Sequence, residues 1–154
     1  MSIEQRVKDL GIELPAVTPP VATYVNAVRT GNLLFLSGKI PVTADGQMLK
    51  GKVGADVSTE EAARHARLVG LHLIAVMRHE LGSLDKVRRV VKLLGMVNAV
   101  PEYGEQPKVI NGCSDLFVAV LGERGRHARS AVGMGSLPLQ ITVEIEAVMR
   151  IHDQ

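Results

Sequence analysis

A strictly alternating run near the C-terminus, residues 141–151 (ITVEIEAVMRI), is the feature that most constrains the fold of this chain. Every second position, from Ile141 to Ile151, carries an apolar side chain. The first three positions between them carry Thr142, Glu144 and Glu146. Because strand side chains alternate between the two faces of a sheet, the run predicts a strand with one apolar face. We expect Thr142 and both carboxylates to share the other face.

A guanidinium precedes this strand. Arg129 lies in the small-residue segment HARSAVG, and residues 133–138, which contain glycine and proline, separate it from the alternating run. We expect the two segments to form neighbouring strands. A guanidinium binds a carboxylate bidentately and an acid such as Glu144 transfers protons, so the pair predicts a small-molecule site. A surface ion pair or a solvated strand face is the alternative that the pattern leaves open.

Composition limits the class of protein. A chain of 154 residues with 46% hydrophobic content predicts one domain with a real core. A net charge of +2 and 3% aromatic residues argue against nucleic-acid binding as the main function, because basic runs and stacking platforms are both scarce. The N-terminus does not resemble a signal peptide, and no window reaches the ~20 apolar residues of a membrane span. We therefore expect a soluble, cytoplasmic protein.

The metal-ligating residue types do not form a site. Cys113 is the single cysteine, which excludes an internal disulfide, suits a reducing cytoplasm and predicts a buried structural thiol. His65, His72 and His79 recur every seven residues on a predicted helix. Seven residues span about 10 Å of helix, which is too far for two histidines to share one ion. We expect no metal.

The order of predicted elements indicates an α+β fold. A short helix at 2–10 ends at Gly11 and precedes a proline-rich linker. A hairpin follows (24–28 and 33–36), whose second strand breaks at Ser37-Gly38 and continues over 39–42. The later elements are a helix (58–81), a strand (87–100), a helix (109–121) and two strands. Ser58 and Glu61 have the form of a capping box at the start of the longer helix. The strand at 87–100 is apolar on both sides, which predicts burial on both faces or contact with another subunit.

This order predicts a mixed sheet with two helices packed on one face. The opposite apolar face then lacks a cover within the chain. Self-association would cover it, so we expect a homo-oligomer.

Two motifs together resemble a known family. NAVRTGNLLFLSGKIPV (26–42) and ARSAVGMGSLPLQITVEIEAV (128–148) are similar to motifs of the RidA/YjgF imine deaminases, once catalogued as L-PSP ribonucleases. The likeness covers roughly residues 21–151. It implies a single RidA/YjgF-like domain at 21–154, preceded by an extension at 1–20 made of the first helix and the proline-rich linker.

The resemblance implies a chorismate-mutase-like fold, assembled as a homotrimer with an inner β-barrel and with ligand clefts between subunits. It implies substrates that are small imines and enamines released by pyridoxal-phosphate enzymes, such as 2-iminobutyrate and 2-iminopropionate. Hydrolysis gives the 2-oxo acid and ammonia, and the protein itself needs no cofactor. The expected partner is therefore a 2-imino or 2-oxo acid.

The resemblance also assigns roles to residues. It implies that Arg129 binds the substrate carboxylate and that Glu144 activates water. The implied substrate-binding positions are Tyr24, Ser37, Gly38, Asn111 and Ala131. Ala131 stands where deaminases often have cysteine, so a thiol cannot contribute there, although a backbone amide still could. A non-catalytic trimer that binds small molecules is therefore the alternative function, and a ribonuclease or translation inhibitor is a third.

Each of these residues also has a purely structural explanation. Arg129 could form a salt bridge with Glu144 or Glu146, and either carboxylate could simply be solvated. Two carboxylates about 7 Å apart on one face could raise one pKa if they are buried. The remaining structural alternatives are packing for Tyr24, a β-bulge at Ser37 and Gly38, and a solvent-facing position for Asn111.

Overall fold

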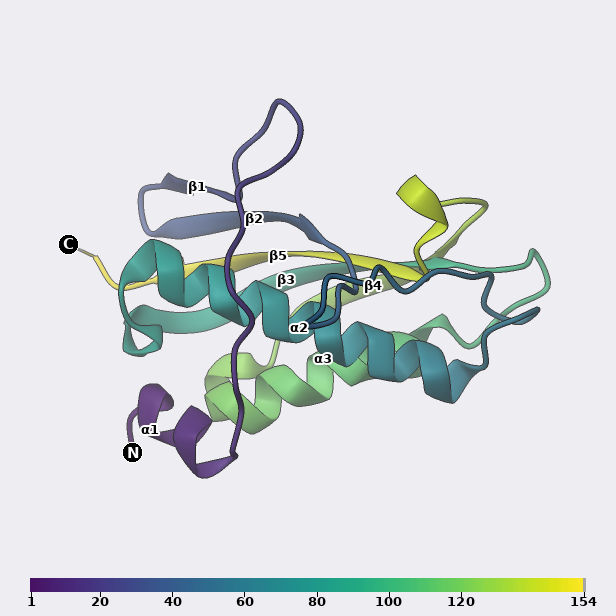
Figure 1. The fold of residues 1–154 in the computed structure, drawn as a ribbon. Helices are drawn as coiled ribbons and strands as arrows, with labels where there is room; N and C mark the ends of the chain where they lie inside the picture. Colours follow the sequence, from purple (N-terminus) through teal and green to yellow (C-terminus); the bar gives the residue numbers. More distant parts are fainter. Residues whose placement is uncertain (154) are drawn as a thin grey trace.

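The computed structural model of the protein describes residues 1–153. Its elements are α1 (Ile3–Asp9), β1 (Ala27–Thr30), β2 (Leu33–Lys39), α2 (Thr59–Leu81), β3 (Val87–Asn98), α3 (Gln106–Leu121), β4 (Ala128–Met134) and β5 (Val143–Ile151). Short 3-10 turns, η1 (Leu84–Lys86), η2 (Gly122–Gly125) and η3 (Pro138–Gln140), lie between them. The five strands form one sheet, and α2 and α3 lie against one of its faces (Figure 1). The predicted α+β layout is therefore confirmed.

The strand order of the sheet is β1-β2-β5-β3-β4. Only β3 and β4, which α3 connects, run parallel, whereas β5 is antiparallel to both of its neighbours. The expectation that the strands of Arg129 and Glu144 are neighbours is wrong, because β3 separates β4 from β5. The connection through α3 places β4 beside β3, at the edge of the sheet. Residues 135–142 then lead the chain back across the sheet, so that β5 enters between β2 and β3.

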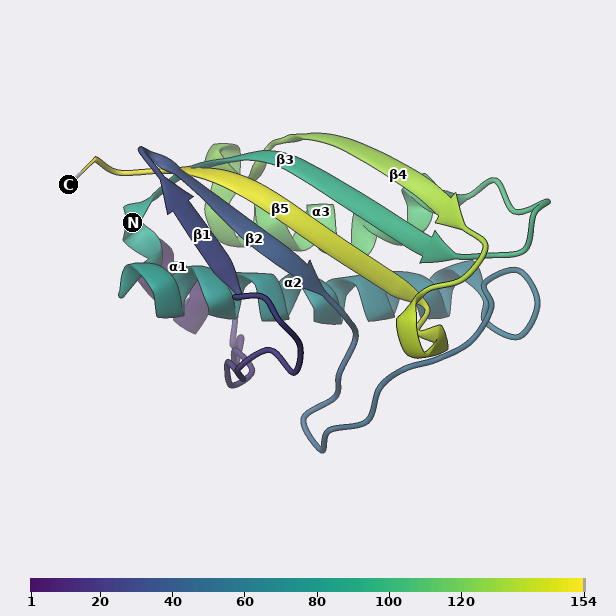
Figure 2. The ribbon, with the colours of Figure 1, turned by 90° about the horizontal axis from the view of Figure 1, so that it is seen from above.

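Strand β5 has the predicted alternation. Its inward side chains are all buried beneath the helices: Val143, Ile145, Ala147, Met149 and Ile151. Glu144 and Glu146 lie on the opposite face, which no helix covers (Figure 2). Thr142, which we expected on that face, is instead fully buried, and its hydroxyl contacts His65 Nδ1 at 2.7 Å. The alternation fails there because the strand begins one residue later, at Val143.

Strand β3 differs from the predicted strand in its exposure. The register against β5 shifts between Val87 and Arg89 and again between Val90 and Lys92. These irregularities place buried residues three positions apart, so that Val87, Val90 and Leu93 all face the helices. Burial on both faces is therefore not found within one chain, because residues 88, 89, 91 and 92 are exposed.

The first hairpin is shorter than predicted. Strand β1 begins at Ala27, so Tyr24 lies in the loop before it and not in the strand. Strand β2 continues to Lys39 across an irregularity in its pairing with β5 between Leu36 and Lys39. Ser37 and Gly38 occupy this irregularity, which agrees with the expected break at that point.

Helix α2 begins and ends where the sequence predicts. Ser58 Oγ accepts a hydrogen bond of 3.1 Å from the backbone N–H of Glu61, and Gly82 closes the helix at φ +79°. The Glu61 carboxylate contacts Arg64 and His65, so only one half of the predicted capping box forms. Helix α3 begins at Gln106, earlier than predicted, with Pro107 in its first turn.

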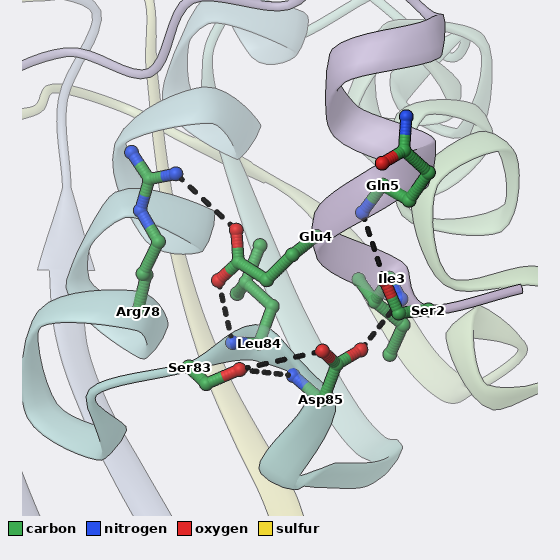
Figure 3. Close-up of polar contacts among 8 residues, drawn as sticks. All are labelled: Ser2, Ile3, Glu4, Gln5, Arg78, Ser83, Leu84 and Asp85. Atoms are coloured by element: carbon green, nitrogen blue, oxygen red, sulfur yellow. Dashed lines mark hydrogen bonds and ion pairs between the residues drawn. The ribbon is translucent and has the colours of Figure 1, made fainter.

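Helix α1 docks on the rest of the chain through reciprocal caps (Figure 3). Asp85 Oδ1 accepts a hydrogen bond of 2.6 Å from the N–H of Ile3, and Glu4 Oε1 accepts one of 2.9 Å from the N–H of Leu84. Glu4 also pairs with Arg78 of α2 at 3.4 Å. The carboxylate of Asp85 in η1 thus caps the start of α1, and the carboxylate of Glu4 in α1 caps the start of η1. The side chains of Ile3 and Val7 are buried in the core that the sheet, α2 and α3 share.

Cys113 is a buried free thiol, as expected, and burial raises its pKa far above the ordinary value. Among residues 1–153, no helix is both long enough and apolar enough to cross a membrane.

The contact between α2 and α3 leads to a stability prediction. A Cβ at Gly112 of α3 would collide with the backbone carbonyl of Ala63 in α2. Because neither backbone can move without separating the helices, we expect Gly112→Ala to lower the free energy of unfolding by about 2–3 kcal/mol. Denaturant unfolding measures the change. Gly104→Ala is the control, because a Cβ there meets nothing within 4 Å, and equal losses in both variants would contradict the proposed collision.

Candidate functional site

The predicted site residues form two separate groups in one chain. The Glu144 group comprises Glu144 itself with Tyr24, Ser37 and Gly38, at the β2 irregularity and the start of β5. The Arg129 group comprises Arg129 and Ala131 on β4 and Asn111 on α3. Strand β3 lies between the two groups.

The two charged residues also face opposite sides of the sheet. Arg129 lies opposite Leu93 in the β3–β4 ladder, and Leu93 is fully buried beneath the helices. Glu144 lies opposite Met96, whose neighbours on β3, Gly95 and Val97, face the helices. Because side chains alternate along a strand, Arg129 faces α3 whereas Glu144 faces the uncovered side. One chain therefore does not bring the guanidinium and the carboxylate together.

The Glu144 carboxylate lies close against the backbone of Gly38. A Cβ at position 38 would stand 2.6 Å from Glu144 Oε2, so any larger residue here would displace the carboxyl group from its present position. Ser37 donates a hydrogen bond from Oγ to Val25 O at 2.6 Å. This bond ties the half-exposed loop that carries Tyr24 to the same end of β2.

Burial raises the pKa of Glu144, and the nearby Glu146 carboxylate raises it further. Glu144 is half-buried, whereas Glu146 is exposed. No cation pairs with Glu144 within 4 Å among residues 1–153. A carboxyl group with a raised pKa and no ion-pair partner is suited to accept and return a proton.

Two groups of the chain hold the Arg129 guanidinium. Its Nη1 donates to Ser114 Oγ at 2.9 Å, and its Nη2 donates to the carbonyl oxygen of Pro107 at 3.3 Å. No salt bridge joins Arg129 to Glu144 or Glu146 within residues 1–153, so the structural ion pair does not form in one chain. The Nε–H and one N–H on each Nη remain for a bidentate carboxylate.

Two residues that no sequence pattern singled out, Ser114 and His127, adjoin the Arg129 group. Ser114 Oγ lies 2.9 Å from His127 Nε2, and His127 Nδ1 lies 2.6 Å from the carbonyl oxygen of Gly125. His127 and Arg129 are two residues apart, and that spacing alone would have suggested a shared side of the chain. Ser114 had no comparable signal, since α3 and β4 meet only in the folded chain.

The last two predicted positions of the Arg129 group contribute little polar chemistry within one chain. Ala131 packs against the hydrophobic core, and its side chain offers no donor or acceptor. Asn111 is exposed on α3.

Two of the three histidines of α2, His65 and His72, contact different groups. His65 is buried, and its Nε2 lies 3.0 Å from Glu61 Oε1. His72 Nε2 lies 2.8 Å from the carbonyl oxygen of Val42. Across residues 1–153, no three His, Cys, Asp or Glu side chains are arranged to hold a metal ion.

Comparison with known proteins places this fold in a family. Residues 4–148 match the family model described as "YjgF/chorismate_mutase-like, putative endoribonuclease". Protein TCP17 of Trypanosoma cruzi is 40% identical over 98% of this chain and 95% of its own length. The crystal structure of Atu1372 from Agrobacterium tumefaciens is 47% identical, covers 97% of this chain and 94% of its own, and superposes with a TM-score of 0.88.

More distant members share the same architecture. The crystal structure of RidA from the Antarctic bacterium Psychrobacter is 28% identical, covers 90% of this chain and 94% of its own, and has a TM-score of 0.60. The matches to TCP17 and Atu1372 span nearly the whole chain. The protein therefore belongs to the YjgF/chorismate mutase-like family.

Proposed function

We propose that this protein hydrolyses small 2-imino and enamine acids to 2-oxo acids and ammonia. Arg129 holds the substrate carboxylate, and Glu144 activates the attacking water. The observation that carries the proposal is the half-buried Glu144 carboxyl, which lies against Gly38 with a raised pKa and no ion-pair partner among the described residues. Members of the family to which the chain belongs are imine deaminases.

The chemistry requires only modest assistance from the protein. The Glu144 carboxylate takes a proton from water as the water oxygen bonds to the imine carbon. It then returns that proton to the nitrogen of the carbinolamine. As the C–N bond breaks and ammonia leaves, the carboxylate takes the remaining hydroxyl proton, so that the carbon becomes a carbonyl; the departing ammonia then takes this proton away as ammonium. A protonated imine is already electrophilic, so orientation of the substrate by the guanidinium and proton transfer by one acid suffice.

The site proposed here belongs to two chains of a homotrimer. Arg129 and Glu144 face opposite sides of one sheet, so a second copy must supply one of them to each cleft. The uncovered face carries exposed apolar side chains suited to such an assembly: Val28, Phe35, Val91 and Val132. A closed trimer would bury these side chains and form equivalent clefts.

A non-catalytic trimer that binds 2-oxo acids is the second candidate. The observation that favours it is Ala131, whose side chain packs on the core and supplies no thiol or other polar group. In that case Arg129 would still bind a carboxylate, and no ammonia would be released.

Substitution of Arg129 tests the proposed anchor. We expect Arg129→Ala to lower kcat/KM for 2-iminobutyrate, generated in situ by a threonine dehydratase, by about 100-fold or more, because a charge-assisted bidentate contact is lost. Arg129→Lys keeps the charge without the fork and should recover only part of the activity. Ammonia release measures the rate. Wild-type protein that does not exceed the buffer rate, but is stabilised by 2-oxobutyrate, would favour the non-catalytic trimer.

Removal of the Glu144 charge should lower the activity of the protein and raise its stability. The raised pKa means that the ionised carboxylate destabilises the folded state, and that this penalty grows as pH rises through the raised value. Glu144→Gln should therefore raise Tm by about 1–2 °C at pH 7–8 and leave it unchanged below pH ~4. The same variant should lose most of its ammonia release. Glu146→Gln, at the exposed neighbour, is the control, and a lower Tm for Glu144→Gln at pH 8 would contradict the argument.

Mixing of two inactive variants tests the shared cleft. When Arg129→Ala and Glu144→Gln chains are co-expressed in equal amounts, some interfaces combine an intact guanidinium from one chain with an intact carboxylate from another. Random assembly should restore up to about a quarter of the wild-type activity. If both residues act within one chain, the mixture will stay as inactive as either variant alone.

A further inference from the structure

We propose that Ser114 and His127 are positioning residues that hold the Arg129 guanidinium in the orientation that receives a carboxylate. The identity of that carboxylate rests on the proposed function, whereas the anchoring of Arg129 does not. Neither residue belongs to the motifs by which the chain resembles its family, and both lie where α3 meets the start of β4.

The chemistry of the partners sets the direction of each hydrogen bond. The carbonyl oxygen of Gly125 can only accept, so His127 Nδ1 carries the proton in the 2.6 Å contact. In a neutral imidazole, Nε2 must then accept, and Ser114 donates its hydroxyl proton to it at 2.9 Å. A lone pair of Ser114 Oγ accepts from Arg129 Nη1 at 2.9 Å. The Gly125 carbonyl therefore orients, through His127, the Ser114 hydroxyl that accepts the hydrogen bond from Arg129 Nη1.

The surroundings of His127 support this role. The imidazole is half-buried, and the ring of Phe117 packs edge-on against it, with centroids 6.0 Å apart and an interplanar angle of 75°. Burial lowers the pKa of His127 and the Arg129 charge lowers it further, while the bond to Gly125 opposes both effects. The imidazole is thus held in place and kept in the neutral form that the hydrogen bonds require.

Anchoring of this kind lowers the entropy that Arg129 loses on binding. Ser114 and the Pro107 carbonyl each occupy one N–H of the fork, on the side that faces α3. An arginine fixed before the ligand arrives does not lose its rotamer freedom on binding, so loss of the anchor should weaken carboxylate binding about 2- to 12-fold.

Nuclear magnetic resonance tests the anchor without a ligand or turnover. In wild-type protein labelled with ¹⁵N, we expect the His127 ring to show the Nδ1–H tautomer. We also expect the Arg129 guanidinium, assigned by comparison with Arg129→Lys, to rotate slowly about its Cζ–Nη bonds. Ser114→Ala and His127→Phe should speed rotation about the Cζ–Nη1 bond, whereas Nη2, which the Pro107 carbonyl still holds, should change less. Ser114→Thr, which keeps the hydroxyl, should leave both unchanged. Unchanged slow rotation about Cζ–Nη1 in Ser114→Ala, or an Nε2–H tautomer in the wild type, would overturn the proposal.

Binding of 2-oxobutyrate by calorimetry and hydrolysis of 2-iminobutyrate test the consequence. Ser114→Ala and His127→Phe should raise Kd and KM about 2- to 12-fold while kcat changes much less, because Glu144 remains intact. Ser114→Thr should restore Kd, and His79→Phe, an exposed matched change on α2, should leave it unchanged.

The two proposals fail in different ways. If Arg129→Ala loses binding and Ser114→Ala does not, the positioning role is wrong and the proposed anchor for the substrate survives. If Arg129→Ala binds 2-oxobutyrate like the wild type, the proposed function is wrong, and the resonance experiment still decides whether Ser114 and His127 hold the guanidinium.

Discussion

The insertion of β5 between β2 and β3 is the constraint on which the rest of the structure depends. Its inward side chains are buried beneath α2, so the phase of this one strand determines which face of the sheet the helices cover. A shift of one residue would turn five apolar side chains to solvent and bury Glu144 and Glu146. The same phase places Glu144 on the uncovered face, against Gly38. The core and the acid of the candidate site are thus set by one register.

That register also explains why the proposed site is incomplete in a single chain. Because β3 lies between β5 and the edge strand β4, Arg129 and Glu144 of one chain cannot line the same side of a cleft. Arg129 is held by α3 through Ser114 and Pro107, on the face that the helices cover. In the proposed site, assembly of identical chains brings the guanidinium of one chain to the half-buried acid of another.

Local physics made much of the fold predictable. A capping serine, a glycine in the left-handed region and strict alternation act over a few residues, and α2 and β5 accordingly follow the prediction closely. The structure differs from the sequence prediction where contacts between distant segments decide burial and strand order. Thr142 precedes the strand and is buried by its contact with His65, and irregular pairing with β5 changes the exposure pattern of β3. The strand order depends on a helical crossover that no local pattern encodes.

The sequence by itself determined the family motifs, the alternation of β5 and the residue types of the candidate site. Arg129, Glu144 and Gly38 were all identified from it. Only the tertiary structure decided that Arg129 and Glu144 lie on opposite faces, that Ser114 contacts the guanidinium, and that His127 contacts Ser114. The physical reason is that side-chain alternation is a property of one strand, whereas the order of strands and the packing of α3 on β4 depend on contacts between segments far apart in the chain.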